Sequence, residues 1–153
     1  MMAKILKPNH YLEIGTGYGD TFNLVCKYAE FLTGIDRVKR SKVNSRFNVM
    51  LYKGDSDSFF KTNKSRYDMI FIDGDHRFDQ VKKDIVNALS VLNYDGVIFV
   101  HDTFPKGEIY KIDDKCSDSW KVPAWIRSNP FVDVMDVKKH PGLTIIKHKE
   151  ARK

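Results

Sequence analysis

Short apolar runs alternate with longer mixed segments from residue 10 onward. This alternation is typical of βαβ units wound around a largely parallel sheet. Residues 69–72 are apolar and lie between two carboxylates, as expected for a central strand that is buried on both faces. Segments 131–137 and 143–147 alternate apolar and polar positions and suit an antiparallel pair. The pattern therefore predicts an α/β protein with about seven strands, over residues 11–14, 32–36, 47–52, 68–73, 97–100, 131–137 and 143–147.

Helices are expected between these strands. The clearest covers residues 78–92 and is followed by a turn at 93–96. Its apolar stripe consists of Val81, Ile85, Ala88, Leu89 and Leu92. A short helix begins near Pro123 and should end before Pro130.

Two earlier helices are predicted from capping residues. Asp20 or Thr21 can cap the first one. Its inward face would comprise Phe22, Val25, Tyr28, Ala29 and Leu32. The second would be capped within residues 56–58. The polar segment 38–46 reads as a short helix or an irregular connection, and segment 103–119 as a surface loop or a lid over a site.

Length and composition favour one domain over residues 1–153, because 42% of the residues are hydrophobic. No apolar run reaches membrane-spanning length and no signal-peptide pattern is visible, so we expect a soluble cytoplasmic protein without a membrane partner. Cys26 and Cys116 have no metal-ligand spacing and read as unpaired thiols. The formal charge of +6 admits an anionic partner, although solvated faces and a charged tail explain its two local runs, 37–46 and 138–153, more often than RNA binding does.

Three glycines on alternate positions, Gly15, Gly17 and Gly19, separate the first strand from its helix. Glycine tolerates positive φ and close approach of a backbone or a ligand, so the loop suggests a cradle, whereas an ordinary βα turn needs only one glycine. A dinucleotide fingerprint would require another glycine where the chain has Asp20, and no Gly-Lys-Ser/Thr of a phosphate-binding loop follows.

Carboxylates stand at or just past the predicted carboxyl ends of five strands: Glu13, Asp36, Asp55, Asp73 and Asp102. Ligands of open α/β sheets gather at this edge, and helix capping alone does not readily explain five such residues. Asp36 follows the glycine loop by about twenty residues, where a carboxylate can bind both hydroxyls of a ribose. For Asp55, a helix cap remains an equally good interpretation.

The spacing Glu13-x-Gly15-x-Gly17-x-Gly19 resembles motif I of class I S-adenosylmethionine-dependent methyltransferases. The resemblance implies a Rossmann-like, doubly wound sheet with helices on both faces, and it implies S-adenosyl-L-methionine as the cofactor. Asp36 would then hold the ribose, and Asp55 would lie near the adenine. The resemblance also assigns cofactor contacts to Asp73 and to the loop that would hold the methionine part, formed by Glu13, Gly15, Thr16, Gly17, Tyr18 and Gly19.

Residues 72–76 and 100–103 form a second pair of motifs. Neighbouring strands lie about 4.8 Å apart, so carboxylates at their ends could share a divalent cation. The motifs resemble those of the O-methyltransferase branch that includes catechol, caffeoyl-coenzyme A and antibiotic-sugar enzymes. That resemblance implies that Asp73 and Asp102 bind Mg²⁺ or another divalent cation, with Thr103 at a position where Asn is often a further ligand.

The catalytic candidates are Asp73, His76 and His101. His76 stands three residues after Asp73, where several relatives place a lysine that removes the acceptor's proton, and a histidine can do this near neutral pH. His101 could be a metal ligand, a base or an orienting group.

The resemblance implies methyl transfer to a hydroxyl of a small sugar or phenolic acceptor. Relatives of the catechol type carry extra helices before the first strand that help cover the site, and this chain has only about ten residues there. We therefore expect a site that is open, completed by a second subunit of a homodimer, or shaped for a larger substrate. One alternative is a nucleic-acid methyltransferase, but its amino-methylating forms carry an Asn/Asp-Pro-Pro-aromatic motif where this chain has Asp73-Gly74-Asp75-His76. The other is a non-catalytic nucleotide-binding module.

Overall fold

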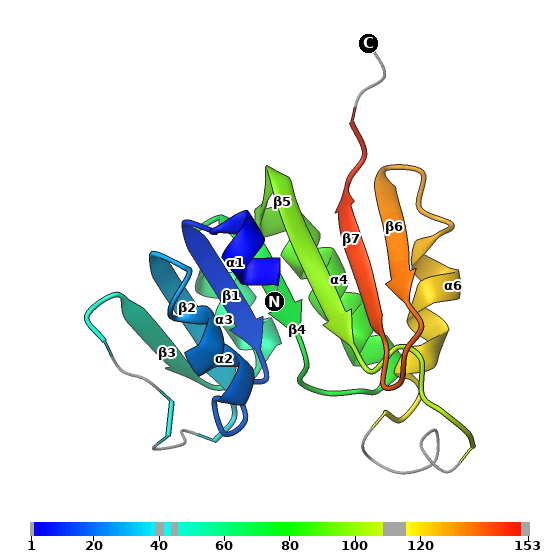
Figure 1. Cartoon of the computed structure of the whole chain (residues 1–153), viewed down its shortest axis with the longest axis horizontal. Helices are drawn as coiled ribbons and strands as arrows, with labels where there is room; N and C mark the ends of the chain where they lie inside the picture. The colour runs from blue at the N-terminus through cyan, green and yellow to red at the C-terminus, as the bar shows by residue number, and fades with distance from the viewer. Residues whose placement is uncertain (1, 39–41, 44–45, 109–115, 151–153) are drawn as a thin grey trace.

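The computed structural model describes residues 2–38, 42–43, 46–108 and 116–150 (Figure 1). Its centre is a seven-stranded sheet in the order β3-β2-β1-β4-β5-β7-β6. The first five strands in sequence pair in parallel, and β7 pairs antiparallel with both β5 and β6. The strands are β1 (His10–Ile14), β2 (Phe31–Asp36), β3 (Val49–Lys53), β4 (Tyr67–Ile72), β5 (Leu92–His101), β6 (Val132–Val137) and β7 (Leu143–His148).

Helices cover both faces of the sheet, which confirms the doubly wound fold (Figure 1). On one face, α1 (Met2–Leu6) and α2 (Asp20–Val25) contribute Ala3, Phe22 and Val25 to a core with the strand residues Tyr11 and Leu32. The other face packs against α3 (Ser56–Thr62), α4 (Phe78–Val91) and α6 (Val122–Ile126), and the 3₁₀ helix η1 (Ser119–Lys121) packs on α4 and α6.

Helix α2 ends earlier than the sequence pattern predicts. Helix α2 ends at Val25, so Tyr28, Ala29 and Leu32 do not continue its inward face, and that expectation was wrong. Leu32 is buried instead as a strand residue, because β2 begins at Phe31 and pairs with β1 from His10↔Phe31 onward. Apolar spacing alone does not distinguish a helix from a turn followed by a strand.

Two strand boundaries also differ from expectation. Strand β3 begins at Val49, because the backbone N–H of Val49 closes a turn to the carbonyl of Arg46 and leaves Phe47 exposed. The turn expected at 93–96 lies inside β5, whose register shifts: Leu92 pairs with Tyr67, but Val97 pairs with Met69.

Segment 103–119, expected to be a surface loop or a lid, is only partly described, because residues 109–115 lie outside the described part of the chain. In segment 38–46, residues 39–41 and 44–45 also lie outside it. The described ends of segment 103–119 are anchored. Thr103, Cys116 and Ser119 are buried, and the Asp118 carboxylate accepts a hydrogen bond of 2.6 Å from the backbone N–H of Phe78 at the start of α4.

Both cysteines are free thiols, as expected. Among the described helices, none has the length and apolar character needed to cross a membrane.

The fold makes the α4 stripe a sensitive test of packing. Ile85 is fully buried in the core, whereas the next residue, Val86, is 56% exposed. We expect Ile85→Ala to lower the free energy of unfolding by about 2–5 kcal/mol, because it leaves a cavity. Val86→Ala should change it by less than about 0.5 kcal/mol. Urea unfolding of the two variants checks this, and equal losses would contradict the packing described.

Candidate functional site

The glycine loop after β1 packs directly on the end of β4. Gly15 has φ +86°, and a Cβ at this position would come within 2.3 Å of the Asp73 carbonyl oxygen and 2.5 Å of the Gly74 Cα. Gly17 has φ +50°, but a Cβ there would meet nothing within 4 Å. Gly15 is therefore required by the close backbone approach, while Gly17 leaves open space beside the loop.

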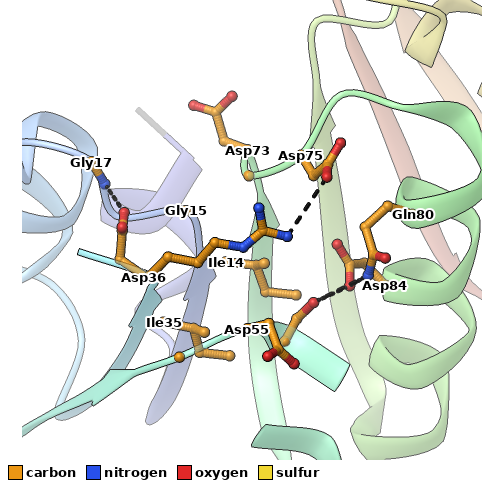
Figure 2. Close-up of a pocket in the computed structure, with 14 residues that line it drawn as sticks. Ile14, Gly15, Gly17, Ile35, Asp36, Asp55, Asp73, Asp75, Gln80 and Asp84 are labelled. Carbon is orange, nitrogen blue, oxygen red and sulfur yellow. Dashed lines mark hydrogen bonds and ion pairs between the residues drawn. The ribbon is translucent and has the colours of Figure 1, made fainter. Parts of the chain in front are cut away.

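That open space belongs to a cavity of about 320 Å³ at the carboxyl ends of β1, β2 and β4 (Figure 2). Asp36 at the end of β2 borders it. Its Oδ2 accepts a hydrogen bond of 2.8 Å from the Gly17 N–H, and its Oδ1 accepts one of 2.8 Å from the Val38 N–H. A carboxylate has about four lone-pair positions, so Asp36 keeps acceptor capacity for a ligand.

One wall of the cavity comes from α4, which the sequence analysis did not assign to the site. Gln80 and Asp84 line the cavity (Figure 2). Ser56 donates a hydrogen bond of 2.5 Å to Asp84 Oδ1, and the Gln80 amide donates one of 3.2 Å to the same oxygen. Burial raises the pKa of Asp84 to about 6, and these hydrogen bonds oppose the shift. The available signal was a carboxylate placed beside the apolar stripe of α4.

Asp55 lines the same cavity, and its side chain also caps α3. Its Oδ1 accepts a hydrogen bond of 2.7 Å from the Ser58 N–H, and this bond holds the pKa of Asp55 below its usual value. The expected helix cap is thus present, together with a place on the cavity wall. A further ion pair, Arg37 to Asp75 at 3.8 Å, joins the ends of β2 and β4 across the cavity; neither residue was predicted (Figure 2).

Glu13 is only 1% exposed and is not among the residues that line this cavity. It shares a face of β1 with Tyr11, whose hydroxyl donates a hydrogen bond to it. Burial raises the pKa of Glu13 to about 8, and the negative charge of Asp73 adds to the shift. Of the remaining loop residues, Thr16 is buried and Tyr18 is exposed.

The carboxyl ends of β4 and β5 bring two carboxylates and two histidines together. Ile72 pairs with Val100, so the following residues, Asp73 and His101, emerge side by side. His101 Nδ1 lies 3.1 Å from Asp73 Oδ1 and 3.1 Å from Asp102 Oδ1. His76 Nε2 lies 3.5 Å from Asp73 Oδ1 and 3.4 Å from Asp102 Oδ2. The expected candidates therefore meet at one place.

The histidines determine the charge of this cluster. Hydrogen bonds to Asp102 and Asp73 raise the pKa of His101 to about 10, so its imidazole is protonated at neutral pH. Burial alone would raise the pKa of Asp73, but hydrogen bonds from His101 and His76 hold it below its usual value. A protonated His101 cannot accept a proton, but a divalent cation on the same carboxylates would lower its pKa, so His76 and His101 both stay candidates for a base.

Ligand atoms of Asp73, His76 and Asp102 all lie within 4.8 Å of one another. Ligands on one octahedral cation of Mg²⁺ size are about 3–4 Å apart, so the two carboxylate oxygens fit a divalent cation after small side-chain movements, and His76 Nε2 is close enough to be a third ligand or a base beside the ion.

Asp102 adopts φ +59°, which is unusual for a residue other than glycine. Two buried contacts hold this turn: the Ser119 hydroxyl donates a hydrogen bond of 2.7 Å to the Asp102 carbonyl, and Thr103 Oγ1 lies 2.9 Å from Thr144 Oγ1. Thr103 is only 1% exposed. Its hydroxyl is hydrogen-bonded to Thr144 of β7, and its role as a third metal ligand stays a prediction.

Comparison with known proteins identifies the class to which this fold and site belong. Residues 12–103 match the family model described as a methyltransferase domain, which spans the glycine loop through Thr103. The chain belongs to this methyltransferase-domain family, and the expected resemblance is confirmed. No curated protein sequence matches the chain significantly.

Solved structures share the fold at low sequence identity. An O-methyltransferase from Bacillus cereus in complex with S-adenosylhomocysteine is 18% identical, with a TM-score of 0.78 over 97% of this chain and 77% of that one. The O-methyltransferase TomG from Streptomyces achromogenes, in complex with S-adenosylmethionine, is 16% identical, with a TM-score of 0.76 over 97% and 77%. The N-methyltransferase NodS from Bradyrhizobium japonicum is 14% identical, with a TM-score of 0.71 over 94% and 87%. The fold therefore does not by itself decide which atom is methylated.

Glu13 gives the site a pH-dependent stability. Its folded pKa of about 8 exceeds the value of an ordinary carboxyl, so the folded protein binds a proton that the unfolded chain releases between about pH 4 and pH 8. The stabilisation from this group is complete at acidic pH and is lost as the pH rises through about 8. We expect Glu13→Gln to remove this loss and to be relatively more stable than wild type above pH 8. Urea unfolding from about pH 4 to pH 9 tests it, and wild-type and variant stabilities that stay parallel between about pH 4 and pH 8 would contradict it.

Proposed function

We propose that this protein is an S-adenosyl-L-methionine-dependent methyltransferase that methylates a hydroxyl of a small molecule, with help from a divalent cation. The observation that carries the proposal is the position of the Asp73–His76–Asp102 cluster at the edge of the cavity bordered by the glycine loop, since Asp73 lines that cavity. Family membership supports the methyltransferase class. The O-methyltransferases among the structural neighbours favour oxygen as the acceptor atom.

The cavity suits S-adenosylmethionine in size and charge. Its volume of about 320 Å³ is at the lower end of the range for small-molecule sites. Its lining carries one arginine and five carboxylates, Asp36, Asp55, Asp73, Asp75 and Asp84, and this excess of negative charge favours a ligand with sulfonium and ammonium groups. We assign the ribose to Asp36 and the adenine to the end of the cavity formed by Asp55, Gln80 and Asp84. When bound, the cofactor would supply a methyl group on a positively charged sulfur.

In this proposal, two carboxylates and one histidine activate the hydroxyl of the acceptor. Asp73 and Asp102 would hold the cation, and its charge would favour the deprotonated form of a bound hydroxyl. His76 Nε2, close to both carboxylates, would accept the hydroxyl proton. We do not include Thr103 among the ligands, because its hydroxyl is engaged with Thr144.

The cofactor assignment is tested by titration calorimetry with S-adenosylhomocysteine. We expect Asp36→Ala to weaken binding by about 10- to 100-fold, because a hydrogen bond to a charged group contributes roughly 1.5–3 kcal/mol. Asp133→Ala on β6 removes an exposed carboxylate and serves as the matched control, with unchanged affinity. If the folded wild-type protein does not bind S-adenosylhomocysteine, the methyltransferase proposal fails; binding without transfer to any hydroxylated acceptor favours a non-catalytic module.

The cation assignment is tested with Mn²⁺ as a paramagnetic probe. We expect Asp73→Asn and Asp102→Asn each to weaken Mn²⁺ binding at least tenfold, because each removes a charged ligand. His76→Ala should keep Mn²⁺ binding and abolish methyl transfer. Electron paramagnetic resonance titration measures the free ion. Loss of Mn²⁺ in His76→Ala would instead make His76 a metal ligand, and unchanged binding in both aspartate variants would remove the cation from the proposal.

A further inference from the structure

A second cavity, of about 660 Å³, lies next to the Asp73–His76–Asp102 cluster. It is lined by residues 103–106 after β5, by the η1–α6 segment, and by Lys138 and His140 between β6 and β7. We call it the basic cleft. Thr103, which immediately follows Asp102, forms part of its wall, so the cleft begins one residue along the chain from the cluster.

The sheet order sets the two cavities on opposite sides of the cluster. The first cavity lies over the ends of β2, β1 and β4, and the cluster comes from the ends of β4 and β5. The basic cleft lies over the end of β5 and over the β6–β7 connection, which reaches the same edge because β7 runs antiparallel to β5 (Figure 1). A methyl donor in the first cavity and an acceptor in the cleft would meet at the cluster.

The charge of the cleft is opposite to that of the first cavity. Its lining includes Lys106, Arg127, Lys138 and His140, and no Asp or Glu is among the described residues that line it. The Arg127 guanidinium already pairs with the Asp136 carboxylate. His140 Nδ1 accepts a hydrogen bond of 3.1 Å from the Lys106 backbone N–H. The lysines therefore supply most of the positive charge that a ligand would meet.

The lining of the cleft also includes apolar and aromatic residues. Phe104, Pro105, Trp120 and Pro123 line it, and Trp120 is 40% exposed. Lys138 Nζ lies 6.0 Å from the centre of the Phe104 ring, so a cation and an aromatic ring are close together in this cleft. A surface of this kind fits a ligand that has a flat or apolar body and an anionic group.

We propose that the basic cleft binds the acceptor through an anionic group, a carboxylate or a phosphate, held by Lys106 and Lys138. The inference rests on the proposed function, because it names the class of acceptor for the same site. It gives the acceptor a hydroxyl directed at Asp73 and Asp102 and an anionic group on the side away from the cofactor. The positive charge of the chain thus has a specific use at this cleft.

The test is calorimetry at saturating S-adenosylhomocysteine with three probes: 3,4-dihydroxybenzoate, its neutral analogue 3,4-dihydroxybenzyl alcohol, and inorganic phosphate. In the wild-type protein, 3,4-dihydroxybenzoate or phosphate should bind, and the benzoate should bind more tightly than the alcohol. The Lys106→Ala/Lys138→Ala double variant should lose about tenfold in affinity for the anions, since it removes two charges from one cleft. The alcohol should be unaffected. Tighter binding of phosphate than of the benzoate favours a phosphate group, and the reverse favours a carboxylate.

Two control variants separate charge from shape. Lys106→Arg/Lys138→Arg should retain anion binding, and Lys61→Ala/Lys64→Ala, which removes two exposed lysines near the end of α3, should not change it. The proposal is overturned if neither anion binds, if the alcohol binds as tightly as the benzoate, or if the double alanine variant binds anions normally. S-adenosylhomocysteine binding is read separately in every variant, so its absence in the wild type counts against the methyltransferase proposal and its presence isolates the cleft.

Discussion

The close contact between Gly15 and the backbone of Asp73 and Gly74 is the constraint on which the site depends. Strands β1 and β4 are neighbours, and the Asp73 N–H donates a hydrogen bond of 2.9 Å to the Ile14 carbonyl, so the β1 loop and the β4 loop begin at the same level. With a Cβ on Gly15 only 2.3 Å from a carbonyl oxygen, one of these loops would have to move. This contact fixes the glycine loop beside Asp73, and every other group of the site is positioned relative to one of the two.

Strand geometry explains which parts of this site could be predicted from the sequence. Asp36, Asp73 and Asp102 end apolar strands, and the carboxyl ends of parallel strands share one edge, so their meeting could be predicted. The face of the sheet on which Glu13 lies could not be predicted, because a strand that is buried on both faces shows no alternation of apolar and polar residues. Glu13 stands two residues after Tyr11 on β1, so the two side chains share the face of the sheet that α2 covers. Asp84 was missed because a carboxylate on a helix usually faces solvent, whereas this one is buried.

For the fold, the sequence predicts the order of helices and strands better than the residues at which they begin and end. The βαβ order and the antiparallel pair follow from composition and period, and both are confirmed. The end of α2 was misplaced because Tyr28, Ala29 and Leu32 keep helical spacing by chance, while pairing with β1 takes Leu32 into a strand. Arg37 and Asp75 were missed because charged residues outside the apolar pattern carry no local signal of a partner 38 positions away along the chain. Tertiary contacts supply what local patterns lack.

The two histidines of the cluster differ because of where the backbone places them. His101 ends a strand, and Nδ1 lies 3.1 Å from each of two carboxylates, so it is held as a cation that offsets their mutual repulsion. His76 lies in the loop before α4, and its Nε2 reaches the same carboxylates only at 3.4–3.5 Å. Under the proposed function, a divalent cation at Asp73 and Asp102 would take over the neutralising role of His101. The strand–loop difference between His101 and His76 would then leave two imidazoles at different distances from the same carboxylates, and His76 is the one proposed to accept the hydroxyl proton.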